Sequence, residues 1–240
     1  MLIFLTFGGP TPNYHSAVAR ICAQAAACNV FDRIIGKTEA DLKTDAEFWE
    51  RNGQFMETNR RGYGYWLWKS YIVKKTLEEM SGDDILVYAD AGCTMNPNGR
   101  KRLAAYCDLT KASPNGILSF QMCFEEHSYT KMDVFAHLNA ADHYTTGQLI
   151  ATAFLMRKCE ASVDLTNRWY ETCCHHSLID DSPSKLPNHP SFADHRHDQS
   201  VWSILRKQSN GIIIDRDETY FGPNWQEGAT YPILATRMRY

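Results

Sequence analysis

The feature that most constrains the fold is a regular alternation of short aliphatic runs with stretches of helical periodicity. Residues 2–7 and 85–89 are continuous apolar runs, which are typical of strands covered on both faces. Thr11 and Pro12 follow the first run and form a cap-then-proline helix start. Alternation of this kind predicts one α/β domain over residues 1–240, with a mostly parallel central sheet flanked by helices.

The other predicted elements continue the alternation. We predict further strands at residues 30–35, 116–121, 149–156 and 211–214, and helices at residues 12–28, 38–49, 65–80, 100–106, 159–174 and 198–207. Residues 177–194 are rich in proline and serine and show no periodicity. Because plain connectors are shorter than this, the segment is a candidate for function.

Charge and composition exclude some classes of partner. The net charge is −3 without a basic cluster, so nucleic acid is not an expected partner. No apolar run approaches the roughly 18 residues of a membrane span, and the N-terminus lacks the charged start of a signal peptide. The eight cysteines form no Cys-x-x-Cys pair and are expected to be free thiols. We therefore expect a cytoplasmic protein, with peripheral attachment to a membrane left open.

The stretch RRGYGYWLWK, residues 60–69, combines four aromatic residues, two glycines and three cations. Arginine suits phosphate oxygens, and an aromatic ring can stack on a base or a sugar. The alternative is a helix start with core aromatics and solvated cations, which we favour for Trp66 because it lies on the apolar face. For Arg61, Tyr63 and Lys69 we expect contact with a ligand.

The stretch YADAGC places one acid, Asp90, at the end of an aliphatic strand and follows it with two small residues. Ligands of open α/β sheets bind beyond the carboxyl ends of the strands. The sequence Thr-Phe-Gly at residues 6–8 ends another strand at the same expected edge. Asp90 could hold a divalent ion through oxygen, although turns also use aspartate.

Two further polar stretches contain candidate acids and bases. His197 and Asp198 begin a helix directly after the long loop, where Asp198 could equally be only a cap. Glu125, Glu126 and His127 follow a predicted strand and are candidate general bases, with an exposed polar loop as the alternative.

Taken in order, these stretches resemble small GT-A-type glycosyltransferases of polysaccharide and lipopolysaccharide synthesis, viral and bacterial ones included. The resemblance covers residues 2–214 and is most specific at residues 61–69 and 87–92. Such enzymes hold Mn²⁺ or Mg²⁺ with an Asp-x-Asp motif. Here Gly92 stands at the second acid, so metal independence stays open. Asp90 would bind the ion with help from His197, or would contact the donor ribose or sugar directly.

The resemblance implies a nucleotide-diphosphate sugar as donor and a hydroxyl of a glycan or glycolipid as acceptor. Its implied donor contacts are Thr6, Phe7 and Gly8 along the nucleotide, Arg61, Tyr63 and Lys69 on the base, ribose or phosphate, Asp90 facing the diphosphate, and Ala91 and Gly92 leaving room for the sugar. Asp198 is the first candidate for the base of an inverting enzyme and Glu126 the second. In a retaining enzyme, Asp198 or Gln199 would lie beneath the anomeric carbon.

Two other classes of function stay open. A nucleotidyltransferase would share nucleotide binding and an acidic site, but it usually needs a lysine in a glycine-rich loop after the first strand. No lysine or arginine precedes Arg20, which counts against this class. A non-catalytic protein that binds a nucleotide or a carbohydrate on the same fold is the second alternative.

Overall fold

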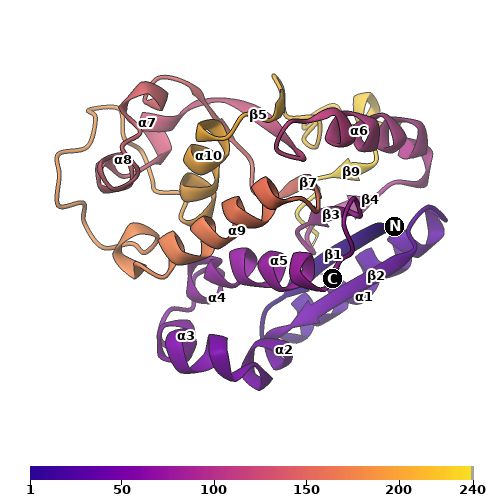
Figure 1. Ribbon diagram of the computed structural model, residues 1–240, viewed down its shortest axis with the longest axis horizontal. Coiled ribbons are helices and arrows are strands. Elements are labelled where there is room, and N and C mark those ends of the chain that lie inside the picture. The colour runs from indigo at the N-terminus through magenta and orange to yellow at the C-terminus, as the bar shows by residue number, and fades with distance from the viewer. Residues whose placement is uncertain (239–240) are drawn as a thin grey trace.

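A seven-stranded sheet runs through the computed structural model, which describes residues 1–238 (Figure 1). Its order is β2-β1-β3-β7-β5-β6, with β8 beside β5. The strands are β1 (Leu2–Gly8), β2 (Arg33–Thr38), β3 (Ile85–Ala89), β5 (Ile117–Glu125), β6 (Gly147–Leu149), β7 (Ala153–Arg157) and β8 (Ile212–Ile214). A separate two-stranded sheet pairs β4 (Thr94–Met95) with β9 (Ile233–Leu234).

Five of the seven strands run in one direction. β1 is parallel to β2 and β3, and β8 is parallel to β5, whereas β7 is antiparallel to both β3 and β5 and β6 is antiparallel to β5. The predicted α/β class with a mostly parallel sheet is therefore confirmed. Because β1 and β3 are parallel neighbours, their carboxyl ends meet at one edge of the sheet.

Helices cover both faces of this sheet (Figure 1). α5 (Leu67–Glu79), α9 (Glu160–Cys173) and α10 (Asp198–Gln208) pack on the face that receives Ile3 and Leu5. α1 (Pro12–Ala27) and α6 (Arg100–Ala112) pack on the face that receives Phe4. The other helices are α2 (Glu39–Thr44), α3 (Ala46–Thr58), α4 (Gly62–Tyr65), α7 (Glu126–Tyr129), α8 (Met132–Leu138) and the 3₁₀ turns η1 (Pro97–Gly99), η2 (Ala141–His143), η3 (His176–Leu178) and η4 (Trp225–Gly228).

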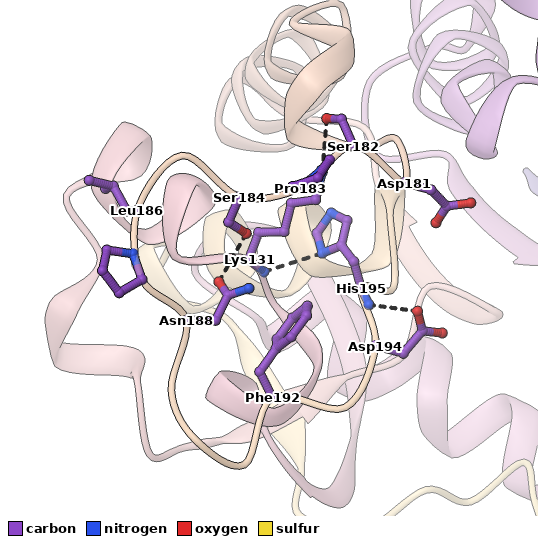
Figure 2. A pocket seen from close by; sticks show the side chains of 11 residues that line it. Lys131, Asp181, Ser182, Pro183, Ser184, Leu186, Asn188, Phe192, Asp194 and His195 are labelled. Carbon is purple, nitrogen blue, oxygen red and sulfur yellow. Dashed lines mark hydrogen bonds between the residues drawn. The ribbon is translucent and has the colours of Figure 1, made fainter.

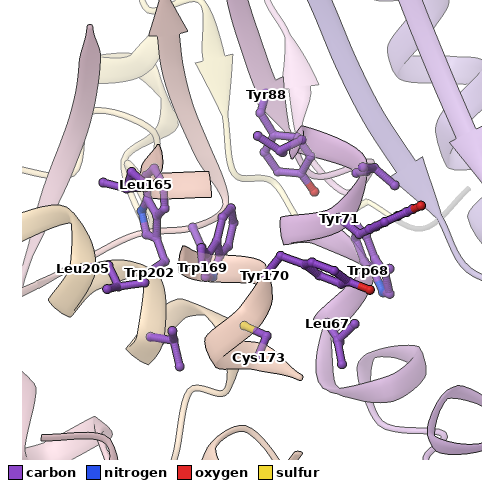
Figure 3. Packing of buried hydrophobic residues seen from close by; sticks show 14 of the residues in the cluster. Leu67, Trp68, Tyr71, Tyr88, Leu165, Trp169, Tyr170, Cys173, Trp202 and Leu205 are labelled. Carbon is purple, nitrogen blue, oxygen red and sulfur yellow. The ribbon is translucent and has the colours of Figure 1, made fainter. Parts of the chain in front are cut away.

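Aromatic side chains pack α5, α9 and α10 against the face of the sheet that receives Ile3 and Leu5 (Figure 3). Trp169 of α9 and Trp202 of α10 are fully buried with ring centroids 4.8 Å apart. Phe154 of β7 lies 4.5 Å from Trp202 and 5.0 Å from Tyr88 of β3. Each such ring buries about 150–250 Å². This packing holds α10 and the end of β3 in a fixed relation.

Several elements differ from the prediction, two of them for identifiable reasons. The expected strand 149–156 is two strands, because residues 150–152 leave the sheet and bond to the Gln199 side chain and the Asp90 backbone. The expected helix 38–49 divides at Asp45, whose side chain accepts from the Phe48 N–H and starts α3. The strand expected at 30–35 lies at 33–38, and β4, β9, α7 and α8 were not predicted.

The cysteines are free and mostly inside the protein, as predicted, with Cys123 exposed. No helix within residues 1–238 is long and apolar enough to cross a membrane.

Candidate functional site

Three charged side chains from three separate elements meet at the carboxyl end of β3. The Lys69 Nζ of α5 lies 3.1 Å from the Asp90 Oδ1 and 3.4 Å from the Asp198 Oδ2 of α10. It also donates to the Ala151 carbonyl at 3.2 Å. Tyr88 completes the group by donating its hydroxyl to the Asp90 Oδ1 at 2.6 Å. We call Lys69, Asp90 and Asp198 with Tyr88 the Lys69 cluster.

A strained turn aims Lys69 at the sheet. Tyr63, Tyr65 and Trp66 all have positive φ, which is uncommon for residues with a side chain. Gly62 and Gly64 supply the neighbouring positive φ values, and a Cβ at Gly62 would lie 2.3 Å from the Trp66 ring. The glycines therefore serve the turn. The turn starts α5 at Leu67, so that Lys69 lies in its first helical turn.

Burial and charge oppose each other in the Lys69 cluster. Burial lowers the pKa of Lys69, but Asp198 and Asp90 outweigh it and the net pKa is raised. Burial raises the pKa of Asp198 from 3.8 to about 7, and the charge of Asp90 adds to this effect while Lys69 opposes it. Asp90 is the exposed member, with 29% of its side chain accessible against 3% for Lys69. Any ligand therefore reaches Asp90 first.

Several polar atoms near this edge lack hydrogen-bond partners. Residues 1–238 contain six buried side-chain polar atoms without one, and four belong to residues that the sequence singled out. These four atoms are the Thr6 Oγ1, the Tyr63 hydroxyl, the His197 Nε2 and the Asp198 Oδ2. An unmet buried polar group costs about 1–3 kcal/mol. Such atoms are rare in folded proteins, and among these four the Asp198 Oδ2 keeps an ion pair with Lys69.

His197 faces the long loop. Its Nδ1 donates to the Ile179 carbonyl at 2.6 Å, and its ring stacks on Trp66 with centroids 5.4 Å apart. Burial lowers the pKa of His197, which favours the neutral ring. The Nε2 lies 4.0 Å from the Asp181 Oδ1 on the loop. These contacts direct the His197 ring at the long loop, so His197 does not act together with Asp90.

The residues predicted to hold Mn²⁺ or Mg²⁺ do not fit such an ion. Both ions need several oxygen ligands, and Mg²⁺ usually takes one or two carboxylates with phosphates and water. The Asp90 Oδ1 is already held by Lys69 and Tyr88, and His197 is turned away. Across residues 1–238, no group of three or more histidine, cysteine, aspartate or glutamate side chains could hold a metal ion.

The end of β1 lies beneath the site surface. Thr6 is fully buried, and Phe7 stacks on Trp68 with centroids 4.0 Å apart. A Cβ at Gly8 would lie 2.6 Å from the Tyr14 carbonyl oxygen of α1. The structure brings these residues to the predicted edge, but their side chains support the site and offer no surface to a nucleotide.

The two small residues after Asp90 are covered by the chain itself. Ala91 packs against Ala17 and Val18 of α1. The Gly92 carbonyl accepts from the Met238 N–H at 2.8 Å, so the chain end crosses this turn. The space that was predicted for a sugar at Ala91 and Gly92 is therefore filled by protein.

Arg61 and Lys69 lie on different sides of the strained turn. Arg61 is exposed and pairs with Asp181 at 2.8 Å and with Asp194 at 3.1 Å, both from the long loop. Tyr63 is partly buried, and burial raises its pKa to about 12. Arg61 therefore fastens the loop, and its predicted contact with phosphate has to compete with two carboxylates.

The long loop encloses a cavity of about 400 Å³, lined by Lys131, His195 and loop residues that include Asp181 and Asp194 (Figure 2). The Lys131 Nζ donates to the Ser177 carbonyl and lies 3.2 Å from the Asp180 Oδ1. The His195 Nε2 donates to the Leu178 carbonyl at 2.8 Å. Because the Lys131 ammonium and the His195 ring are already bonded to residues of the loop, they stabilise its shape.

Glu126 is inside the protein and is not available as a base. Its side chain is fully buried. The Oε1 accepts from the Lys207 Nζ at 2.7 Å and from the Ser203 hydroxyl, and the Oε2 accepts from the Thr130 hydroxyl at 2.9 Å and from the Gln148 amide at 3.1 Å. These contacts use the bonding capacity of Glu126 for the fold and do not support its predicted place as the second candidate base. Gln199 is likewise bonded, to Ala151 and Gln148.

Sequence reasoning missed two members of this region. Tyr88 is the first residue of the YADAGC stretch. Residues two apart in a strand point to the same side, so this spacing could have indicated that Tyr88 lies beside Asp90. Arg196 directly precedes His197 in the sequence, and its guanidinium lies 3.7 Å from the Tyr129 ring centroid. No local pattern marks Arg196, because its partners are distant in sequence.

No family model and no curated protein matches this chain. Among solved structures, it is similar to a glycosyltransferase involved in the glycosylation of the major capsid of PBCV-1, with 12% identity over 97% of this chain and 91% of that chain and a TM-score of 0.52. Mouse xyloside xylosyltransferase 1 in its apo form is 11% identical over 97% of this chain and 96% of that chain, with a TM-score of 0.46. The first likeness shows a fold of the GT-A kind.

Proposed function

We propose that this protein is a glycosyltransferase that moves a sugar from a nucleotide-diphosphate donor to a hydroxyl of a glycan or glycolipid. The observation that carries the proposal is the Lys69 cluster, in which one buried cation pairs with a partly exposed carboxylate and with a second, buried carboxylate. It lies at the edge of the sheet where open α/β folds bind ligands. The GT-A fold supports the same function.

Asp90 is the residue that contacts the donor sugar in this proposal. Above a pH of about 7, where Asp198 has lost its proton, the Lys69 cluster has one more negative than positive charge. Such a site favours the positive charge that develops at the anomeric carbon during glycosyl transfer. Tyr88 and Lys69 fix the orientation of the Asp90 carboxylate through their contacts with its Oδ1.

Asp198 acts through Lys69 and does not face the ligand. Its side chain is 4% exposed, and its Oδ2 is directed at the ammonium group. That burial favours a positioning role over the predicted role of general base. Positioning residues of this kind hold reacting groups within the narrow geometry that catalysis needs.

A panel of nucleotide sugars tests the proposal. Release of free sugar from UDP-, GDP-, CMP- and dTDP-sugars identifies a donor, and transfer to oligosaccharide acceptors is then measured. We expect Asp90→Asn to lower turnover about a hundredfold or more. The matched control is Asp83→Asn, because Asp83 precedes the same strand at its opposite end, is exposed and pairs only with Arg157. Equal turnover in the two variants would refute the assignment.

Non-catalytic binding of the same ligands is the second candidate function. Two observations favour it: Gly92 is covered by the chain end, and the donor set does not fit a metal ion. The same panel decides between them, since a binding protein would be stabilised by a nucleotide sugar without consuming it.

A further inference from the structure

The cations predicted to hold a diphosphate are paired with carboxylates of the protein itself. Lys69 lies between two carboxylates, and Arg61 pairs with two others. A diphosphate needs positive charge or strong donors to compensate its own charge. Two other arginines, Arg196 and Arg237, have no carboxylate within ion-pair distance among residues 1–238.

Arg196 lies on an aromatic surface with neutral partners. Its guanidinium is 3.7 Å from the Tyr129 ring centroid and 5.0 Å from that of Phe124, which is itself exposed. The NH1 group donates to the Gln148 Oε1 at 3.4 Å and lies 3.2 Å from the Met122 sulfur. An arginine stacked in this way is held in place while its remaining donors can face an anion.

Arg237 is carried to the same edge by the chain end. Its Cα lies 3.6 Å from the position of a Cβ on Gly92, two residues after Asp90. The Met238 N–H donates to the Gly92 carbonyl at 2.8 Å and fixes this approach. Arg237 itself is exposed and has a positive φ, and its guanidinium lies 5.9 Å from the Tyr220 ring centroid.

The two arginines belong to one region that includes the Lys69 cluster. Gln148 accepts from both Arg196 and Gln199, and Gln199 accepts from the Ala151 N–H at 3.0 Å. The Ala151 carbonyl in turn accepts from Lys69. Met122 beside Arg196 and Ala235, two residues before Arg237, pack against the same hydrophobic cluster. Burial lowers the pKa of Arg196, Tyr129 and Asp194 oppose this effect, and the charge of Arg237 adds to it.

We propose that Arg196 and Arg237 form a subsite for the diphosphate of the donor and compensate its charge without a divalent ion. The inference rests on the proposed function, because it names the group that binds the leaving part of the donor. The acidic Lys69 cluster then faces the sugar, and the two arginines face the phosphates. Gly92 lies against the backbone that carries Arg237, with the Arg237 Cα 3.6 Å from the position of a Cβ on Gly92.

Inorganic pyrophosphate is the probe, because it tests the diphosphate subsite without a choice of nucleoside or sugar. Binding to the full chain is measured by titration calorimetry in buffer with EDTA. We expect the unmodified protein to bind pyrophosphate, and Arg196→Gln and Arg237→Gln each to weaken binding about tenfold or more. Arg196→Lys keeps the charge, so it should bind more tightly than Arg196→Gln. Thermal unfolding confirms that each variant is folded.

The matched control is Arg168→Gln. Arg168 is an exposed arginine of α9 that contacts the neutral Gln208 side chain at 3.5 Å, so its replacement removes the same charge elsewhere. Pyrophosphate binding that requires Mn²⁺ or Mg²⁺, or that Arg168→Gln weakens as much as the other two, overturns the proposal. If the subsite binds pyrophosphate through both arginines while no nucleotide sugar is consumed, the subsite stands and glycosyl transfer fails. If sugar is transferred while neither arginine affects pyrophosphate binding, the subsite fails and glycosyl transfer stands.

Discussion

Two buried lysines, Lys69 and Lys207, each pair with a carboxylate that the sequence put forward as functional. Lys207 lies 2.7 Å from Glu126, which also accepts from Ser203, Thr130 and Gln148. We call this group the Lys207 cluster. Both lysines are almost fully buried, yet burial lowers the pKa of Lys207 while the pKa of Lys69 is raised. The effect of one carboxylate on the lysine pKa does not outweigh the effect of burial, whereas the effect of two carboxylates does.

The clusters differ in how completely their bonds are satisfied. Every oxygen of Glu126 has partners, and its side chain is sealed from solvent. In the Lys69 cluster, two acids share one cation, one oxygen of Asp198 lacks a hydrogen bond, and Asp90 is partly exposed. Buried charge that is fully paired supports structure, whereas buried charge that is incompletely paired and open to solvent marks function.

Removing the cation of the Lys207 cluster should have the largest effect on stability. Lys207→Met leaves the Glu126 carboxylate buried without its ion-pair partner, and breaking a buried pair costs about 3–5 kcal/mol. Urea denaturation measures the loss. The double variant with Glu126→Gln should recover part of it, and a double variant as unstable as the single one would contradict the pairing.

The Lys69 cluster should make stability depend on pH through Asp198. Its pKa is raised from 3.8 to about 7, so the folded chain keeps a proton that the unfolded chain has lost between these values. Stability therefore falls as pH rises from about 4 to about 7, by an amount on the order of 2–4 kcal/mol, and is level above that range. Asp198→Asn should remove this slope in denaturation at several pH values. A variant that keeps the full slope would show that another group is responsible.

Single hydroxyl groups allow a matched comparison of the two clusters. Tyr88→Phe removes the bond to Asp90, and Thr130→Val removes a bond to Glu126. Each should cost about 1 kcal/mol in chemical denaturation. Only Tyr88→Phe should also lower sugar turnover, because only Asp90 faces a ligand. Equal turnover losses would remove the distinction between the clusters.

Arg61→Gln should have the smallest effect. Arg61 pairs with Asp181 and Asp194 at the surface, where both acids are about half exposed. Such pairs contribute about 0–1 kcal/mol and weaken in salt. Limited proteolysis should cut the loop of residues 177–194 faster in the variant, while the melting temperature changes little. A large loss of melting temperature would mean that this contact supports the core.

The sequence alone predicts the frame of this site well. Aliphatic runs located β1 and β3, and the rule that ligands bind beyond strand ends pointed to Asp90. The sequence analysis also selected Lys69 and Asp198. The structure brings both residues together with Asp90, although the three are far apart in the chain.

The side-chain environment could not be predicted. Glu126 and Asp198 are both acids near helix starts, and only the three-dimensional packing makes one fully bonded and the other incompletely bonded. Gly92 resembles a residue that leaves space for a ligand, but the chain end fills that space from more than 140 residues away. Long-range contacts of this kind leave no local signal.

A matched lysine replacement tests the central claim most directly. Lys69→Met and Lys207→Met remove the same group from the two clusters, and the turnover of a nucleotide sugar is measured per folded molecule, with the folded fraction taken from denaturation curves. We expect Lys69→Met to lose nearly all turnover and folded Lys207→Met to keep it within about threefold, less than the tenfold that a lost transition-state contact of about 1.36 kcal/mol would cause. Preserved turnover in Lys69→Met, with turnover lost in Lys207→Met, would contradict the account.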